Sequence, residues 1–278
     1  MRSLATAIKV RIRLVIEILP FGRDIFLWLS RARKPLSYRG VFATRSEALT
    51  HIPARASSRY DEINKKKARN AQEENAKLDV YFRDYDYPAF FWLTRCLNDN
   101  AQVLELGGSL GHYFYSCDRF DMLPESVRWT VAELPEAVKL GSAIARERQE
   151  SRLSFLDSEE LANSPPADVF LTAGTLQYME SPIWGLLDSL NGKPRHLIVH
   201  NLPAHRNRSF WTLQNLSVCE VPYRIYSHEQ LLQELVKRGY ELVKEWGHAR
   251  DIEIPFHRQQ SAIEGYLGFY FRLAPEKS

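Results

Sequence analysis

From residue 101 onward the chain alternates short apolar runs with stretches of helical periodicity, and this alternation constrains the fold most strongly. Such a pattern is typical of βαβ units, in which helices cover a mostly parallel sheet. It predicts seven strands, at residues 102–106, 128–133, 152–156, 168–172, 196–200, 241–246 and 266–273. It predicts helices near residues 110–120, 135–149, 182–190 and 227–238. Only a loop joins the last two strands, so we expect an antiparallel pair at the end of the sheet.

Residues 1–79 are expected to form a basic helical extension, followed by an α/β domain at 80–278. Residues 1–40 carry nine basic and two acidic side chains, a net charge of +7, so the chain's total of +3 leaves −4 for the remainder. On a helix, one face would be apolar, through Leu4, Ile8, Ile12, Val15 and Leu19. Charged residues interrupt this stretch, so neither secretion nor membrane crossing is expected. Two interpretations stay open: peripheral contact of residues 1–30 with an anionic membrane, or packing against protein.

Charge pattern and cysteine content exclude several classes of protein. Residues 60–78 mix acids and bases, which predicts a solvated helix and no nucleic-acid partner. The three cysteines, Cys96, Cys117 and Cys219, lie far apart without C-x-x-C spacing, so neither a disulfide framework nor a zinc site is expected. We therefore expect a cytoplasmic protein with no metal centre.

The main functional motif is a buried strand that ends in an acid and a turn of small residues, Glu105-Leu106-Gly107-Gly108-Ser109-Leu110-Gly111. Small residues let the backbone approach a ligand closely, and the helix that follows offers unpaired N–H groups. The second strand ends in Glu133, whose carboxylate can accept both ribose hydroxyls of a nucleoside. Asp157 follows the third strand, where it or its backbone can address an adenine amino group. These residues predict one nucleoside-sized cleft shared by Gly107 and Glu133.

A dinucleotide site would need the pattern G-x-G-x-x-G, but Ser109 and His112 stand where its second and third glycines would be. A nucleotide-sugar-modifying enzyme of the NAD type is therefore disfavoured. Glu105 at the turn also suits a ligand with a positive centre better than it suits a pyrophosphate. The amino and sulfonium groups of S-adenosylmethionine are such centres.

Three segments resemble motifs of class I S-adenosylmethionine-dependent methyltransferases. Residues 105–111 resemble the first motif, an acid followed by G-x-G-x-G, with Ser109 replacing the middle glycine. Residues 133–138 resemble the acidic-Leu-Pro motif of small-molecule O-methyltransferases, and residues 167–179 resemble the fourth-strand motif. The resemblance implies a Rossmann-like sheet with helices on both faces and S-adenosylmethionine as cofactor. It implies cofactor contacts from Glu105, Gly107, Gly108, Ser109, Gly111, Glu133, Leu134, Asp157, Ala173, Gly174 and Tyr178.

Over residues 38–273 the chain also resembles a family of bacterial proteins classed as methyltransferases and associated with surface-polysaccharide (O-antigen or capsule) biosynthesis; residues 38–42 and 210–215 are part of this pattern. The resemblance implies O-methylation of a sugar or glycan-precursor hydroxyl. His200 and His205 are the two candidates for its general base, since His200 ends the predicted fifth strand and His205 lies five residues further on, near the carboxyl edge of the sheet where ligands bind.

The acceptor is expected to contact Gln177, Trp211 and Gln214, because aromatic faces and amide side chains suit sugars. An alternative of another class stays open. A catalytically inactive, methyltransferase-like scaffold in a membrane-associated glycan-assembly complex would also account for Ser109 and the basic N-terminal residues.

Overall fold

The computed structural model describes residues 37–53, 82–216, 219–250, 252–255, 257, 263 and 265–275. The predicted basic helix within residues 1–30, the predicted solvated helix at 60–78 and the predicted domain boundary at 79 lie outside these ranges. In the described part of the chain, no helix combines the length and the apolar content that a bilayer crossing requires.

The described structure is built on a sheet in which seven strands follow the order β4-β3-β2-β5-β6-β10-β9. Its parallel strands are β2 (Gln102–Leu106), β3 (Arg128–Glu133), β4 (Leu153–Asp157), β5 (Val169–Ala173) and β6 (His196–His205). Strand β10 (Tyr266–Leu273) runs antiparallel to β6 and to β9 (Tyr240–His248). All seven strands predicted from the sequence are present, and the predicted antiparallel pair is confirmed.

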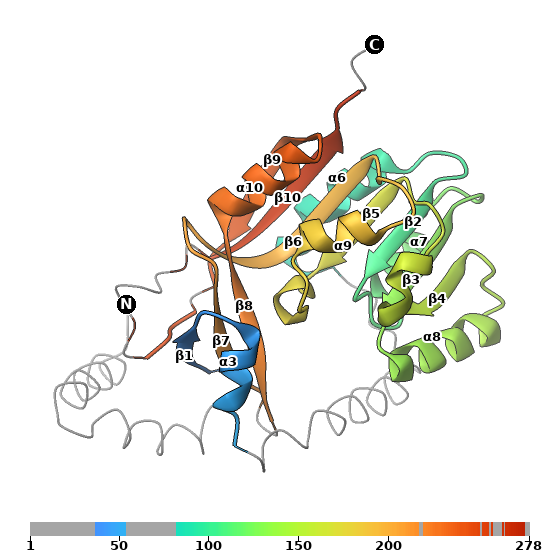
Figure 1. Ribbon diagram of the computed structural model, residues 1–278. Coiled ribbons are helices and arrows are strands. Elements are labelled where there is room, and N and C mark those ends of the chain that lie inside the picture. The colour runs from blue at the N-terminus through green and yellow to red at the C-terminus, as the bar shows by residue number, and fades with distance from the viewer. Residues whose placement is uncertain are drawn as a thin grey trace, which may run out of the picture.

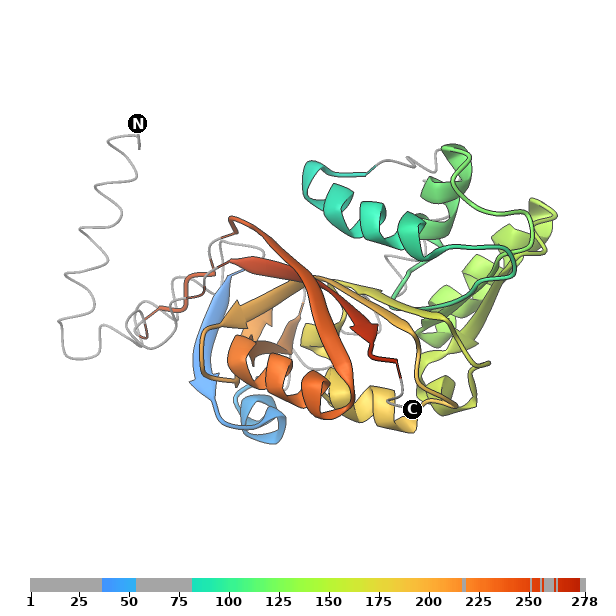
Figure 2. The same ribbon diagram turned by 90° about the horizontal axis from the view of Figure 1, so that it is seen from above.

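Helices cover both faces of this sheet, because successive strand residues point in opposite directions. On one face, Val103 and Trp129 pack with residues of α6 (Tyr87–Cys96), α7 (His112–Arg119) and α8 (Pro135–Glu147). On the other face, Leu104 and Phe170 pack with residues of α9 (Ile183–Ser189) and α10 (His228–Lys237). Figure 2 shows α6 on the opposite side of the sheet from α9 and α10. This arrangement confirms the Rossmann-like architecture.

Three strands that the sequence analysis did not predict form an antiparallel extension, which we call the β1–β7–β8 sheet. Strand β7 (Phe210–Asn215) pairs with both β1 (Tyr38–Phe42) and β8 (Glu220–Ser227). Strand β8 in turn pairs with the last two residues of β6, so the extension continues the main sheet and raises the total to ten strands. Helix α3 (Arg45–Thr50) packs on it, and Figure 1 shows β1 and α3, in blue, beside β7 and β8, in orange.

Candidate functional site

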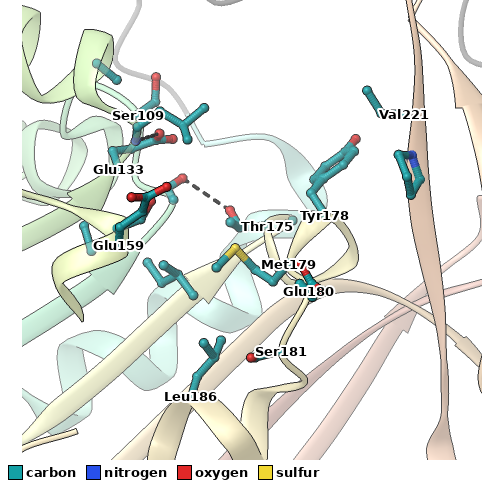
Figure 3. Close-up of a pocket in the computed structure, with 18 of the residues that line it drawn as sticks. Ser109, Glu133, Glu159, Thr175, Tyr178, Met179, Glu180, Ser181, Leu186 and Val221 are labelled. Carbon is teal, nitrogen blue, oxygen red and sulfur yellow. Dashed lines mark hydrogen bonds between the residues drawn. The ribbon is translucent and has the colours of Figure 1, made fainter. Parts of the chain in front are cut away.

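A cavity of about 730 Å³ lies at the carboxyl ends of the parallel strands. Residues that follow β2, β3 and β4 line one side, which we call the strand-end wall. The opposite side, which we call the extension wall, comes from α3, from the start of β8 and from Tyr178–Ser181, which begin in the short helix η4 (Leu176–Tyr178). Figure 3 shows Ser109, Glu133 and Glu159 on the first side and Tyr178 and Val221 on the second. Open α/β sheets bind ligands at this edge, and the volume is typical of small-molecule sites.

The turn after β2 forms part of the strand-end wall through Gly107, Ser109 and Leu110. Gly107 has φ +78°, and a Cβ there would lie 1.9 Å from Oγ1 of Thr175, so only glycine fits this position. Ser109 has φ +55°, a left-handed conformation that glycine adopts far more easily. Ser109 therefore adopts, at the position of the missing middle glycine, a backbone conformation that glycine would adopt without strain.

Glu133 ends β3 and lines the same cavity as Gly107. Its Oε2 accepts a hydrogen bond from the backbone N–H of Leu134 over 2.6 Å, which fixes the direction of the carboxylate at the strand end. The structure therefore brings together the two positions from which the nucleoside cleft was predicted. Leu134, Ala173, Gly174 and Tyr178, which were also predicted to contact the cofactor, line this cavity too.

Glu105 lies beneath the turn and is not among the residues that line the cavity. Its side chain is buried on the same face of the sheet as Trp129, and the Trp129 Nε1–H donates a hydrogen bond to its Oε2 over 2.8 Å. Burial raises the pKa of the Glu105 carboxyl to about 8, against the opposing effect of the Trp129 hydrogen bond. A Cβ on Gly108 would lie 2.4 Å from the carboxyl carbon of Glu105, so the turn packs directly on this group. This position does not support the predicted contact between Glu105 and a positively charged ligand.

Three other predicted cofactor residues stand behind the cavity wall: Gly108, Gly111 and Asp157. Gly111, with φ +88°, precedes α7. Asp157 caps the short helix η3 (Ser158–Asn163), since its Oδ1 accepts from the N–H of Glu159 over 2.9 Å. The next two residues, Ser158 and Glu159, do line the cavity. Asp157 therefore contributes to the site by positioning its neighbours.

The three predicted acceptor residues do not line the cavity. Gln177 is buried, and its Nε2 donates to the carbonyl oxygen of Gly174 over 2.8 Å. Trp211 is buried in a cluster with Phe42 and Ala48, and the guanidinium of Arg224 lies 4.5 Å from its ring centre. Gln214 accepts a hydrogen bond from the hydroxyl of Tyr178 over 2.8 Å. Gln214 thus acts on the cavity through Tyr178 rather than by direct contact.

The two histidines proposed as bases also lie away from the cavity lining. His200 is 1% exposed; its Nδ1 accepts from Nε1–H of Trp246 over 3.1 Å, and its Nε2 lies 3.1 Å from Oδ1 of Asp86. Nδ1 of His205 accepts from the backbone N–H of Arg208 over 3.2 Å. A general-base role for either histidine stays a prediction, and their positions do not support it.

Three charged residues of the extension wall were missed: Arg45, Glu180 and Glu220. Arg45 comes from α3, and its Nη1 lies 3.4 Å from Oε2 of Glu180. Glu220, at the start of β8, forms a two-pronged ion pair with Arg39 of β1. Nothing in the local sequence marks these residues, because their meeting depends on the pairing of β7 with both β1 and β8.

A chain of buried hydroxyl groups holds Tyr178 in the extension wall. Gln214, which accepts from Tyr178, donates through Nε2 to the hydroxyl of Tyr38 over 3.0 Å. The Tyr38 hydroxyl lies 3.2 Å from that of Tyr266, which lies 2.6 Å from that of Tyr223. The Tyr178 ring also meets the Tyr223 ring edge to face at 5.2 Å. These contacts make the Tyr178 ring a rigid part of the cavity.

No protein-family model matches the chain, and no curated protein matches it. Solved structures do. A chain of the complex that contains the Haloferax volcanii Trm112 methyltransferase activator is 15% identical, with a TM-score of 0.52 over 80% of this chain and 99% of that one. The Burkholderia thailandensis 1,6-didemethyltoxoflavin-N1-methyltransferase, solved with S-adenosylhomocysteine, is 15% identical, with a TM-score of 0.47 over 80% and 92%.

The mitomycin 7-O-methyltransferase is 15% identical as well, with a TM-score of 0.44; the match covers 68% of this chain and about half, 54%, of that one. At these identities the likeness shows the fold alone. The described chain therefore has a Rossmann-like fold of the kind found in methyltransferases.

Proposed function

We propose that this protein is an S-adenosylmethionine-dependent methyltransferase that methylates a hydroxyl of a sugar or glycan precursor. One observation carries the proposal: the Gly107 turn and the Glu133 carboxylate line a single cavity at the carboxyl edge of the sheet. The polysaccharide context, the cytoplasmic location and peripheral membrane contact by residues 1–30 belong to the same proposal, and they are supported by the resemblance and the charge pattern of the sequence.

The residues of the strand-end wall fit S-adenosylmethionine. In this proposal the Glu133 carboxylate would accept the ribose hydroxyls, and Ser158 and Glu159 would border the adenine. The turn at Gly107 and Gly174 would border the methionine portion, and all five residues line the cavity. Three carboxylates on this wall, Glu133, Glu136 and Glu159, favour a cationic ligand. When bound, the cofactor would supply a methyl group on a sulfonium centre.

The extension wall would hold the methyl acceptor. The rigid ring of Tyr178 offers an aromatic face for a sugar, and Glu180 and Ser181, which line the same cavity, offer polar contacts. Positioning of a hydroxyl against the methyl group is the main requirement of such a transfer, and it accelerates the reaction by reducing the entropic cost of encounter.

Isothermal titration with S-adenosylhomocysteine tests the proposal. We expect saturable binding by the wild-type protein and binding that is weaker by about tenfold or more in Glu133→Ala, because the ribose hydroxyls lose their acceptor. Glu147→Ala is the matched control, since Glu147 is exposed at the last residue of α8 and does not line the cavity. Absence of heat at millimolar ligand would contradict the enzyme and favour the inactive scaffold.

A further inference from the structure

We infer that the methyl acceptor carries an anionic group, a phosphate or a carboxylate, and that the guanidinium of Arg45 binds it. The inference rests on the proposed function and names the acceptor class of the same cavity. Arg45 projects from α3 into the extension wall, beside the residues that begin β8.

The guanidinium of Arg45 is incompletely paired. Its Nε is buried and has no hydrogen-bond partner. Its Nη1 meets Glu180 at 3.4 Å, a long contact, and the Glu180 side chain is 76% exposed. Buried donors normally have partners, and an exposed ion pair contributes little to stability. An oxyanion in the cavity would replace the long contact with Glu180, whose side chain can turn to solvent, and a small rotation of the Arg45 side chain would bring Nε to the same oxyanion.

Charge is distributed unevenly between the two walls. The strand-end wall contributes Glu133, Glu136 and Glu159, and Arg45 is the one basic residue among the described residues that line the cavity. At the extension wall the two acids already have partners. Glu220 is paired with Arg39, and Glu180 contacts Arg45 through its side chain and Arg224 through its backbone oxygen.

Each carboxylate of the extension wall is thus compensated by one guanidinium, and a third guanidinium, that of Arg224, contacts the backbone oxygen of Glu180. The carboxylates of the opposite wall have no basic neighbour among the described residues that line the cavity, so that end is the more acidic of the two. A cation at the strand-end wall and an anion at the extension wall match this distribution.

Shape points the same way. The Tyr178 ring is part of the extension wall and is held by Gln214 and Tyr223. A sugar packed on this ring would direct a substituent toward Arg45 on one side and a hydroxyl toward the strand-end wall on the other. The planar guanidinium then forms paired hydrogen bonds with a phosphate or carboxylate, which lysine cannot reproduce.

The test measures binding of three soluble probes by isothermal titration: glucose-1-phosphate, glucuronate and the neutral methyl glucoside. Each is titrated into wild-type protein with and without saturating S-adenosylhomocysteine. We expect one or both anionic probes to bind and the neutral glycoside to bind at least about tenfold more weakly. Arg45→Ala should weaken the anionic probe by about tenfold or more, and Arg45→Lys should recover part of the affinity.

Arg195→Ala is the matched control, because Arg195 is exposed and lies before the first residue of β6, at the end of that strand away from the cavity. Far-ultraviolet circular dichroism verifies that every variant is folded. Three outcomes would overturn the inference. Arg45→Ala binds the anions as tightly as wild type does, wild type binds the charged and neutral probes equally, or no anion binds at all. S-adenosylhomocysteine binding without anion binding refutes the inference alone, whereas Arg45-dependent anion binding without S-adenosylhomocysteine binding refutes the proposed function alone.

Discussion

The indole N–H of Trp129 donates a hydrogen bond to the carboxyl of Glu105 over 2.8 Å, in the buried layer beneath the turn that follows β2. Both side chains point to the same face of neighbouring parallel strands, so the bond lies inside the sheet's own packing. The carboxyl is held protonated by burial up to a pH of about 8. Glu105 is therefore a neutral structural group over much of the physiological range.

The stability of the protein should depend on pH through Glu105. Its folded-state pKa, about 8, lies above the ordinary value of 4.5, so the native state binds one more proton between these limits. The contribution of this group to the free energy of unfolding is complete below pH 4.5. It is lost as pH rises toward about 8, by up to about 1.4 kcal/mol per pH unit. Glu105→Gln keeps an acceptor for Trp129 without titrating, and should be more stable than wild type by roughly 2–3 kcal/mol near neutral pH.

Urea denaturation between acidic and weakly alkaline pH measures this effect. The exposed Glu136→Gln serves as control, and its unfolding free energy should follow the wild-type pH curve. A Glu105→Gln protein with the same pH slope as wild type would show that Glu105 is not the titrating group.

Gly107→Ala should be strongly destabilising. A methyl group there would overlap Thr175, in addition to the cost of φ +78°. Gly192 has φ +102° with nothing within 4 Å of an added Cβ, so Gly192→Ala isolates the backbone cost, about 1–2 kcal/mol. We expect Gly107→Ala to lose a further 1–3 kcal/mol or so from the overlap, measured by chemical denaturation. Equal losses in the two variants would mean that the turn moves away from Thr175 without cost.

Ser109→Gly should stabilise the protein. Ser109 adopts φ +55°, and glycine would relieve this conformation for a gain of about 0.5–1 kcal/mol, visible as a higher melting temperature. Affinity for S-adenosylhomocysteine should be retained, since the backbone path is unchanged. Ser109→Ala keeps the strained φ and should show no gain. A loss of stability in the glycine variant would reveal a stabilising contact of the serine hydroxyl.

His200→Ala should affect folding more than chemistry. The substitution removes the acceptor of the Trp246 Nε1–H and one of the partners of the Asp86 carboxyl, at a cost of about 2–4 kcal/mol. Affinity for S-adenosylhomocysteine should change little. His205→Ala, at the last residue of β6 where it pairs with β8, should cost less than about 1 kcal/mol. Normal stability of His200→Ala together with loss of methyl transfer would instead support the base role predicted from the sequence.

The central sheet and one wall of the cavity could be predicted from the sequence. Buried parallel strands are continuous apolar runs, and their carboxyl ends must share an edge, so Gly107 and Glu133 followed from spacing alone. Side chains alternate along β2, so Glu105 lies on the same face of the sheet as Val103. Leu106, which lines the cavity, lies on the other face. This consequence of strand geometry was available before the structure.

The extension wall could not be predicted. Strand β8 contains Pro222, which has no N–H to donate to a ladder and usually argues against a strand. Strand β1 is short and forms only through its pairing with β7. Because Arg45, Glu180 and Glu220 meet through these distant pairings, no local pattern marks them as one site.

The pairing of β1 with β7 also bears on how the protein is made. Tyr38 and Gln214 face each other in register although 176 positions separate them in the chain. During synthesis, the first strand leaves the ribosome long before its partner exists, and such distant pairings form slowly. The extension wall is therefore completed only after most of the polypeptide has emerged, so nascent chains would lack the Arg45 end of the cavity.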